Sequence, residues 1–483
     1  MRWTKRLFHV ILITLVLGST SCLHEPIPSG FVSMEEGRFI LDGHPFFPLV
    51  MNYSVSLVTD GDRFWPASYS GYEPDDRFHC DDPASCEAKL RAELVRMRDT
   101  GFNAVRIVKL AEGPTEHPQG EGMVLLAHDP QGLPVFPNYN DAVVRARHIE
   151  AVRSFVRIAG DVGLKVILLT TIHEKIPATR QNFTEVADAL REEPAILAFD
   201  LFNEPLYFDL PAREKKSAHD VVRSWRRLAK KHAPHHLITI GLTGIRETHA
   251  WDPDILDVDF ISFHPYEYEP DQVLNELRWY GEHVRTPWII GETSLPADGD
   301  SVPYEEQQRF AQRTLEQTVA CGGVGYSWWQ FKDVHWGRFH SDKMGLWTEE
   351  GVEKPTAEVF RKFDPMNTSG ACANLPNYHN YSQHRSAKLT GRLLDEEGGP
   401  VEGGVILAWN QDYSHSYHTT TRADGSFELL GDLYFHHWIA SAIGHSMVRG
   451  DCSPGSYRRG NDSIPDLYLG DLLVKRLRFA EPG

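Results

Sequence analysis

Residues 196–205 read Ile-Leu-Ala-Phe-Asp-Leu-Phe-Asn-Glu-Pro, an apolar run of strand length that ends in Asn203, Glu204 and a proline. Residues 288–293, Trp-Ile-Ile-Gly-Glu-Thr, repeat the pattern and place Glu292 after a second apolar run. A carboxyl group directly after a buried strand costs free energy unless it is paired or used. Two such positions therefore indicate a functional site at the carboxyl ends of parallel strands.

Further apolar runs alternate with amphipathic helical stretches between residues 38 and 366. The other predicted strands are Phe46–Met51, Ala104–Val108, Val166–Thr170, Leu237–Ile240, Phe260–Phe263 and Val324–Trp328. Apolar residues at a spacing of three to four, such as Leu90, Leu94 and Met97, turn one face of each helix toward the strands. Eight strand–helix units over this length predict the α/β class and a (β/α)8 TIM barrel. A doubly wound open sheet is the alternative, but the glycine-rich turn typical of it is missing.

The pattern changes after Phe363. Residues 367–386 are rich in Asn, Ser, Pro and Tyr and lack a period, which predicts a linker. Residues 387–478 contain short strand-like runs separated by turns such as Glu397-Gly398-Gly399-Pro400. Regular short strands without helices predict a small all-β sandwich.

The N-terminus has the features of a signal peptide over residues 1–21, with a basic start and an apolar run from Leu7 to Leu17. The small residues before Cys22 are similar to the cleavage site of bacterial lipoproteins, and this resemblance implies that Cys22 is lipidated. Residues 22–37 would then form a tether. We expect an extracytoplasmic protein held at a bacterial membrane, on the periplasmic side or the cell surface, by its lipid alone. An ordinary secretory peptide is the alternative.

The charge and the histidine content bear on partners and cofactors. The chain has 483 residues and a formal net charge of -18, which opposes binding to nucleic acid and favours an uncharged substrate. His415 and His418, with Asp412 close by, are candidates for a weak surface metal site, but they are remote in sequence from both Glu residues. We therefore predict no catalytic metal and no cofactor. The oligomeric state is left open.

Five cysteines remain after Cys22, and their spacing allows two disulfides. Cys80 and Cys86 flank a short acidic loop, whereas Cys372 and Cys452 bracket most of the C-terminal region. These two pairs fit an oxidising compartment. The expectation leaves Cys321 as a buried, unreactive thiol.

Polar residues follow other predicted strands as well. Arg106 lies in Gly101-Phe102-Asn103-Ala104-Val105-Arg106-Ile107, His264 and Tyr266 lie in Ser262-Phe263-His264-Pro265-Tyr266, and Trp329 ends Gly325-Tyr326-Ser327-Trp328-Trp329. With the two Glu motifs, and in this order, residues 38–366 resemble the cellulase-like glycoside hydrolase family 5.

The resemblance implies roles for single residues. Glu204 would be the general acid/base, Glu292 the nucleophile, and the supporting residues would be Arg106, Asn203, His264, Tyr266 and Trp329. His173, after the third predicted strand, is a further candidate for the family's histidine at the floor of the site. We also expect Arg106 to favour the ionised form of Glu292, and we expect the charge on Glu292 together with partial burial to keep Glu204 protonated near neutral pH.

The resemblance implies a retaining hydrolase that cleaves a β-linked oligo- or polysaccharide of the β-glucan or β-mannan type by double displacement. Two alternatives stay open: a non-catalytic glycan-binding lipoprotein, and a transglycosidase that uses the same residues. Aromatic residues of the long loops are candidates for further subsites, with packing of the loops on themselves as the alternative. They are Trp65, Tyr69, Tyr72, Trp336 and Phe339.

The C-terminal segment resembles the carboxypeptidase regulatory-like or transthyretin-like sandwich through Gly391-Arg392-Leu393-Leu394-Asp395 and Thr421-Arg422-Ala423-Asp424-Gly425-Ser426-Phe427. That resemblance implies a spacer or a docking unit.

Overall fold

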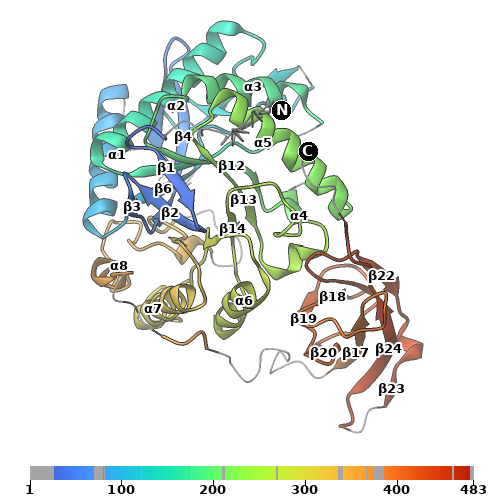
Figure 1. The fold of residues 1–483 in the computed structure, drawn as a ribbon. Coiled ribbons are helices and arrows are strands. Elements are labelled where there is room, and N and C mark those ends of the chain that lie inside the picture. The colour runs from blue at the N-terminus through green and yellow to red at the C-terminus, as the bar shows by residue number, and fades with distance from the viewer. Residues whose placement is uncertain are drawn as a thin grey trace, which may run out of the picture.

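The structure is a computed structural model that describes residues 27–69, 80, 82–120, 122–172, 175–208, 213–267, 270–334, 341–365, 368, 370–373, 386–459 and 462–478. The N-terminal part of these residues forms a barrel with outer helices, and the C-terminal part forms a β-sandwich that lies beside the barrel (Figure 1). Within the described ranges, no helix has both the length and the apolar character needed to cross a bilayer.

Eight parallel strands close the barrel. They are β4 (Leu49–Thr59), β6 (Ala104–Lys109), β11 (Lys165–Leu169), β12 (Ile196–Asn203), β13 (Leu237–Leu242), β14 (Ile261–Phe263), β15 (Trp288–Ile290) and β16 (Tyr326–Trp328). Each strand pairs with the next, and β16 returns to β4, so the predicted (β/α)8 fold is confirmed. The first strand starts later than predicted, at Leu49. It also ends later, because its extension pairs with β5 (Phe64–Ser68) as a hairpin.

Helices cover the outside of the barrel. They are α1 (Pro83–Asp99), α2 (Ala142–Val162), α3 (Pro177–Ala189), α5 (Lys215–His232), α6 (Pro270–His283), α7 (Tyr304–Ala320) and α8 (Ala357–Lys362). The predicted apolar face of α1 is buried at Leu90, Leu94 and Met97. The helix begins where it does because the Asp82 side chain caps its first amides and Pro83 stands at its first position.

The fifth strand–helix unit differs from the prediction. Between β13 and β14 the described chain forms only a short 3-10 helix, η1 (Ile245–His249), and no α-helix. Gly244 precedes η1 with a φ of 119°, a backbone conformation that an α-helix does not allow. Pro253 follows η1, and a proline interrupts the hydrogen bonds of a helix. Two sandwich strands, β18 (Val405–Trp409) and β21 (His437–Ser441), pack against η1. The sandwich thus covers the barrel where an outer helix is missing.

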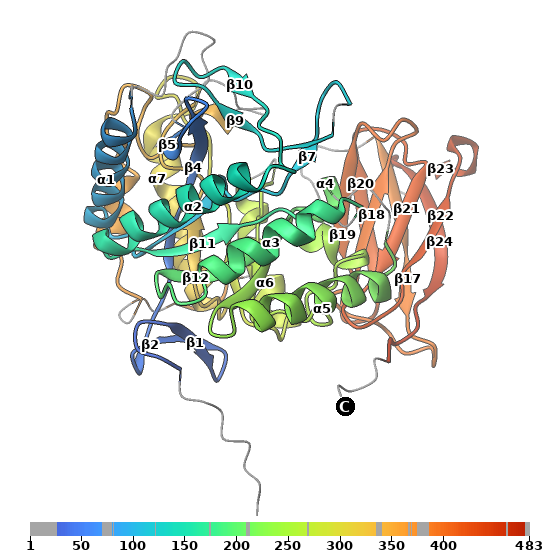
Figure 2. The ribbon, with the colours of Figure 1, turned by 90° about the horizontal axis from the view of Figure 1, so that it is seen from above.

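A small antiparallel sheet closes the bottom of the barrel, the end at which the strands begin (Figure 2). It consists of β1 (Val32–Glu35), β2 (Arg38–Leu41) and β3 (His44–Pro45). Val32 and Phe39 are buried against residues of the barrel strands, among them Val50 and Ile167. Part of the stretch expected to be a tether is therefore packed against the barrel.

The loop after β6 carries four short strands: β7 (Thr115–Glu116), β8 (Met123–Val124), β9 (Ala127–His128) and β10 (Pro134–Val135). Of these, β9 pairs with the end of β4 through His128 and Val58. The loop is thus attached at the mouth, the end of the barrel where the parallel strands terminate.

The C-terminal part is the predicted all-β sandwich. One sheet has the order β20-β17-β24-β23 and the other β19-β18-β21-β22. The strands not yet given bounds are β17 (Ala387–Leu394), β19 (Ser416–Thr420), β20 (Ser426–Gly431), β22 (Val448–Asp451), β23 (Arg458–Arg459) and β24 (Pro465–Leu473). Its own apolar core includes Leu389, Ile406, Phe427 and Ala440, drawn from both sheets.

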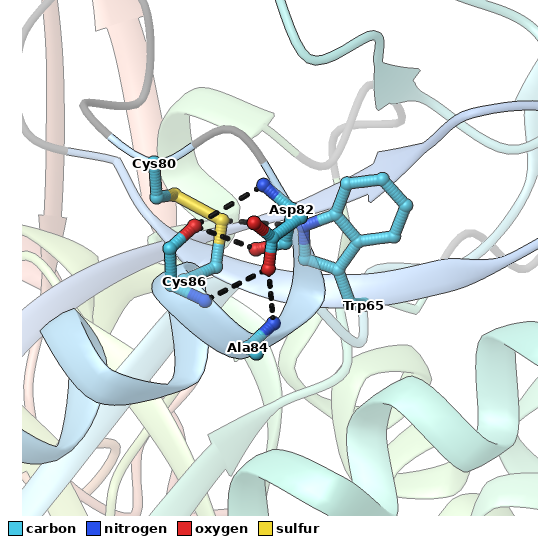
Figure 3. The surroundings of a disulfide bond; sticks show 6 residues. Trp65, Cys80, Asp82, Ala84 and Cys86 are labelled. Atoms are coloured by element: carbon cyan, nitrogen blue, oxygen red, sulfur yellow. Dashed lines mark hydrogen bonds between the residues drawn. A yellow bond between two sulfur atoms is a disulfide. The ribbon is translucent and has the colours of Figure 1, made fainter.

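The predicted disulfide between Cys80 and Cys86 is present at the start of α1 (Figure 3). The Trp65 indole Nε1 donates a hydrogen bond to the Cys86 sulfur at 3.3 Å, and Trp65 is only 5% exposed. Trp65 therefore packs over the disulfide and is not available as a sugar-binding surface.

The second predicted disulfide was wrong. Cys372 is bonded to Cys321, at the C-terminal end of α7, and Cys452 is a free cysteine. The Gln317 side chain forms hydrogen bonds with the backbone of Ala373 in both directions, which holds this segment of the expected linker against α7. Cys452 lies after β22, where its thiol donates to the Phe435 carbonyl. Spacing along the chain could not reveal this arrangement, because tertiary packing brings Cys321 to Cys372.

Candidate active site

Arg106 is the centre of the site at the mouth of the barrel. It lies on β6, is completely buried, and its guanidinium donates four hydrogen bonds. Nε binds Asp200 Oδ2 at 2.8 Å, and Nη1 binds both Glu292 Oε1 at 2.6 Å and Asn52 Oδ1 at 3.2 Å. Nη2 binds Asn203 Oδ1 at 2.8 Å. A single guanidinium therefore fixes side chains from β4 and β12 and the Glu that follows β15.

Glu204 follows β12 directly and begins the turn into the short helix α4 (Pro205–Phe208). Its φ is 47°, in the left-handed region that side chains rarely adopt, and its amide donates to the Gly241 carbonyl. The carboxyl Oε1 lies 3.1 Å from His264 Nδ1. The side chain is 16% exposed, so the carboxyl is open to the mouth only in part.

Glu292 follows β15, on the other side of the mouth from Glu204. Besides the bond from Arg106, its Oε2 accepts a hydrogen bond from the Tyr266 hydroxyl at 3.2 Å. One carboxylate oxygen of Glu204, one of Glu292 and a ring nitrogen of His264 all lie within 4.8 Å of one another. The two carboxyl groups thus face each other across a short gap.

Burial is the largest influence on the pKa of both carboxyl groups. Burial raises the pKa of Glu204 to about 7, against the opposing charges of Arg106 and Arg246. It also raises the pKa of Glu292, although His264 and Arg106 act to lower it. Burial was part of the expectation for Glu204, whereas for Glu292 only the favourable effect of Arg106 was expected, without the cost of burial. Of the two, Glu292 has direct donors in Arg106 and Tyr266, so its anion is the better stabilised.

His264 is held in a space that only glycine neighbours allow. A Cβ atom at Gly241 would lie 2.6 Å from the imidazole, and one at Gly291 would lie 2.8 Å from its Nε2. Burial lowers the pKa of His264 to about 4, so the imidazole is neutral in the free protein near pH 7. A neutral ring can share a hydrogen bond with Glu204 without adding a charge to the site.

Some of the remaining predicted site residues lie at strand ends by the mouth, and others are buried in the core or lie outside the described residues. Asn203 ends β12, and Trp329 follows β16, where it is half-buried and its amide donates to the Thr293 carbonyl. Trp328 is fully buried and binds the Met344 carbonyl, as strand alternation predicts. His173 lies outside the described residues, as do three of the loop aromatics, Tyr72, Trp336 and Phe339. Tyr69 is half-buried, with the Lys109 ammonium 3.4 Å from its ring centre.

Three buried residues of the site were not predicted. Asn52 donates to the carbonyls of Gly291 and Trp328 and thereby ties β4 to the ends of β15 and β16. Asp200 pairs with Arg106 and accepts from the Gly241 amide. Glu247, on η1, accepts hydrogen bonds from the amides of Thr243 and Leu206. A charged residue within the apolar run of β12 was the available signal for Asp200, whereas nothing in the local sequence marks Glu247.

Two groups of side chains in the described residues bring three potential metal ligands together. They are Glu204, His264 and Glu292, and Glu267, Glu276 and His418. Each group contacts an arginine, because Arg106 binds Glu292 and the Arg246 guanidinium lies 3.7 Å from Glu267. A fixed positive charge at this distance opposes a metal cation. The surface site expected from His415 and His418 is not formed, since His418 is only 4% exposed and lies against Glu267.

The chain is similar to a known protein family and to a curated relative. A model of the cellulase family, glycosyl hydrolase family 5, matches residues 80–333, more than half of the chain. A curated protein of Arabidopsis thaliana, "Putative mannan endo-1,4-beta-mannosidase 4", is 24% identical over 254 residues, which are 50% of this chain and 59% of that protein. The chain thus spans less than two thirds of this relative.

Similar solved structures include other glycosidases. A GH5_18 protein of Streptomyces cattleya, solved in complex with Manb1-4GlcNAc, has a TM-score of 0.45 at 18% identity, over 64% of this chain and 80% of that one. A GH5_18 protein of Bifidobacterium longum has a TM-score of 0.45 at 17% identity, over 66% and 82%. A β-D-glucuronidase of Dictyoglomus thermophilum has a TM-score of 0.44 at 15% identity, over 69% and 54%.

The assignment of the chain to a family rests on how much of the chain the family model matches. It covers β6 and the strands that follow as far as β16, together with both Glu motifs and Arg106. The chain therefore belongs to glycosyl hydrolase family 5, the cellulase family.

Proposed function

We propose that the protein cleaves a β-linked glycan with retention of configuration, with Glu292 as nucleophile and Glu204 as general acid/base. The observation that carries this proposal is the short gap between the two carboxyl groups, whose nearest oxygens lie within 4.8 Å. Retaining enzymes hold their two carboxyl groups about 5–5.5 Å apart, whereas inverting enzymes need about 6.5–9.5 Å to admit a water molecule.

In the first step, the Glu292 carboxylate attacks the anomeric carbon and a bond forms between them. The bond from that carbon to the leaving oxygen breaks, and Glu204 gives its proton to that oxygen. A Glu204 pKa of about 7 keeps this carboxyl protonated below neutral pH, as the acid role requires. Arg106 and Tyr266 donate to the nucleophile and hold it in place for the attack.

In the second step, Glu204 takes a proton from water, and the water oxygen attacks the same carbon and displaces Glu292. Asn203 assists both steps. Because Arg106 fixes its Oδ1, the amide nitrogen of Asn203 is left to donate to the sugar 2-hydroxyl, a contact that strengthens as positive charge develops on the ring. Trp329 would supply an apolar ring face under the sugar.

The substrate class is a β-glucan or a β-mannan. The name of the Arabidopsis relative puts β-1,4-mannan first for testing. A panel of soluble β-mannans and β-glucans, with product chromatography over time, separates internal cleavage from release of terminal units. Products longer than the substrate would instead identify the protein as a transglycosidase.

Two variants test the assigned roles with an activated aryl β-glycoside of the preferred sugar. In E292A, added azide should occupy the space of the lost carboxylate and yield the α-glycosyl azide. In E204A, azide should attack the glycosyl-enzyme from the opposite face and yield the β-glycosyl azide. The exposed variant E316Q is the matched control and should keep wild-type turnover. Unchanged turnover in either alanine variant, or an inverted product from the wild type, would refute the mechanism.

We further propose that the mature chain is extracytoplasmic and lipid-anchored through Cys22, and that its C-terminal sandwich is of the transthyretin-like type. Cys22 lies outside the described residues, and the two disulfides support an oxidising compartment. The variant C22S, followed by membrane fractionation and labelling with a radioactive fatty acid, tests the anchor. Equal membrane recovery and equal labelling of both chains would contradict lipidation at Cys22.

A further inference from the structure

The C-terminal sandwich is joined to the barrel by buried polar contacts. The Lys215 ammonium, 3% exposed, donates to Asp252 on the barrel at 2.8 Å and to the Ala442 carbonyl of the sandwich at 2.6 Å. The Gly444 amide also donates to Asp252, and the Trp279 indole of α6 donates to the Gly403 carbonyl at 2.9 Å. Separating the two parts would leave these buried groups without partners, so the sandwich is docked in one position.

One sandwich residue reaches toward the catalytic side of this interface. His418, on β19, is buried, and its Nε2 lies 3.8 Å from Glu267 Oε1. Glu267 belongs to the loop after β14 and directly follows Tyr266, whose hydroxyl binds Glu292. Ligand atoms of Glu267, His418 and Glu276 of α6 lie within 4.8 Å of one another. The sandwich thus contacts the loop that carries a residue of the active site.

Arg246 of η1 connects this cluster to the acid/base. Its Nη2 donates to the Tyr266 carbonyl at 3.2 Å and lies 3.7 Å from Glu267 Oε1. The positive charge of Arg246 also acts on Glu204, whose pKa it lowers against the effect of burial. A change in the contact between Glu267 and Arg246 will therefore change the pKa of Glu204.

Burial and close contacts shift the pKa values of two members of the cluster, Glu276 and His418. Burial and the hydrogen bond with Glu267 raise the pKa of Glu276 well above its usual range, and the Tyr280 hydroxyl donates to Glu276 at 2.6 Å. Burial lowers the pKa of His418 to about 4. The His418 imidazole is therefore neutral near pH 7, and the Arg246 guanidinium is the cation that faces Glu267.

We propose that the sandwich is a working part of the active site, and that His418 is a positioning residue that acts through Glu267 and Arg246 on Tyr266 and Glu204. This inference rests on the acid/base role proposed for Glu204. His418 fills the space beside Glu267 and keeps water away from it, so that Glu267 stays against Arg246. Without the imidazole, Glu267 can turn toward the vacated space and leave Arg246 without its counter-charge.

The titratable and charged groups that face Glu204 are Arg106, His264, Arg246, Glu247 and Glu292, and the sign of the effect follows from the charge on Arg246. Removing the negative charge in E267Q leaves Arg246 uncompensated, which favours the ionised form of Glu204. The alkaline limb of the pH profile should then shift to lower pH, by about 0.5–1 unit for a charge beyond hydrogen-bonding distance. Removing the positive charge in R246Q should shift the same limb to higher pH.

The test uses the full mature chain and compares H418A and the smaller change H418N with H437A. His437 is on β21 of the same sandwich, pairs with Asp451 and makes no contact with the cluster in the described residues, so it is the matched control. We expect H418A and H418N to lower kcat and to move the alkaline limb to lower pH, as E267Q does. H437A should leave both unchanged. The double variant H418A/E267Q should show little further shift, because both changes act on the same charge.

Thermal unfolding of every variant separates this effect from a loss of folded protein, which lowers kcat without moving the limb. A limb at the wild-type pH in folded H418A and H418N, or shifts that add fully in the double variant, would overturn the inference. The assay also distinguishes its failure from failure of the proposed function. If E204A gives no β-glycosyl azide, the acid/base assignment fails, whereas a normal E204A result with an unshifted H418A removes only the role of the sandwich.

Discussion

The Arg106 guanidinium lies 2.6 Å from the Glu292 carboxylate, and both side chains are buried at the mouth of the barrel. Because the same guanidinium also binds Asp200, Asn52 and Asn203, the position of Glu292 depends on β6, β4 and β12. Neither side chain could be replaced without leaving a buried partner unsatisfied.

The variant R106K should keep the charge but lose most of this network, because an ammonium group cannot reproduce the planar fork of donors. We expect kcat to fall by about 10²–10³-fold, the loss typical of removing one aligned donor from an active site. The R98K change, at an exposed arginine of α1, is the control and should have no effect on kcat. Wild-type kcat in R106K would show that Glu292 does not depend on this residue.

The pH dependence of kcat/KM should be bell-shaped. Glu204 must be protonated to act as an acid, so activity should fall as pH rises through its pKa of about 7. Glu292 must be ionised to attack, and since burial raises its pKa, the acidic limb should lie above the value of an ordinary Glu.

The leaving group checks the assignment of the alkaline limb. An aryl glycoside with a very acidic phenol needs no proton from Glu204 in the first step. With such a substrate, the alkaline limb should weaken for that step, whereas the acidic limb should persist. An alkaline limb that is the same for good and poor leaving groups would contradict the assignment to Glu204.

Glu247 should matter for stability. Its carboxyl accepts from two backbone amides, and burial raises its pKa to about 8. The variant E247Q replaces one acceptor by an NH2 group that faces an amide donor, so we expect a loss of about 1–3 kcal/mol in the free energy of unfolding. Urea titration measures it, and the exposed change E316Q should stay within about 0.5 kcal/mol of the wild type. Equal effects of the two variants would refute the prediction.

The two disulfides should contribute unequally to the free energy of unfolding. Cys321–Cys372 closes a loop with a sequence separation of 51, whereas Cys80–Cys86 has a separation of 6. Loop entropy then predicts a loss of about 4 kcal/mol for C321A/C372A and about 2 kcal/mol for C80A/C86A. Mass mapping of peptides from the unreduced chain should recover Cys452 as a free thiol. A peptide joining Cys372 to Cys452 would contradict the pairing.

Much of the barrel could be predicted because its signals are local. The runs at residues 196–201 and 288–290 are apolar except for Asp200, and each is followed within three residues by a Glu. Parallel strands that are buried on both faces require such runs, and their carboxyl ends must meet at one mouth. The same reasoning placed Arg106, His264 and Tyr266 near the two Glu residues, and the structure brings all five together.

The fifth unit could not be predicted in this way. An outer helix was expected after β13, but the chain forms η1 and relies on the sandwich to cover it. Nothing in residues 243–260 indicates which distant segment packs there, because that contact is made by strands more than 140 residues further along the chain.

By itself, the sequence determined the barrel, its strand order and the positions of Glu204 and Glu292, because strand periodicity and the residues at strand ends depend on near neighbours. Only the tertiary structure decided that Cys321 pairs with Cys372, that His418 is buried against Glu267, and that burial raises the pKa of Glu292. These properties depend on how closely distant segments pack and how well they exclude water, and neither quantity is a function of local sequence.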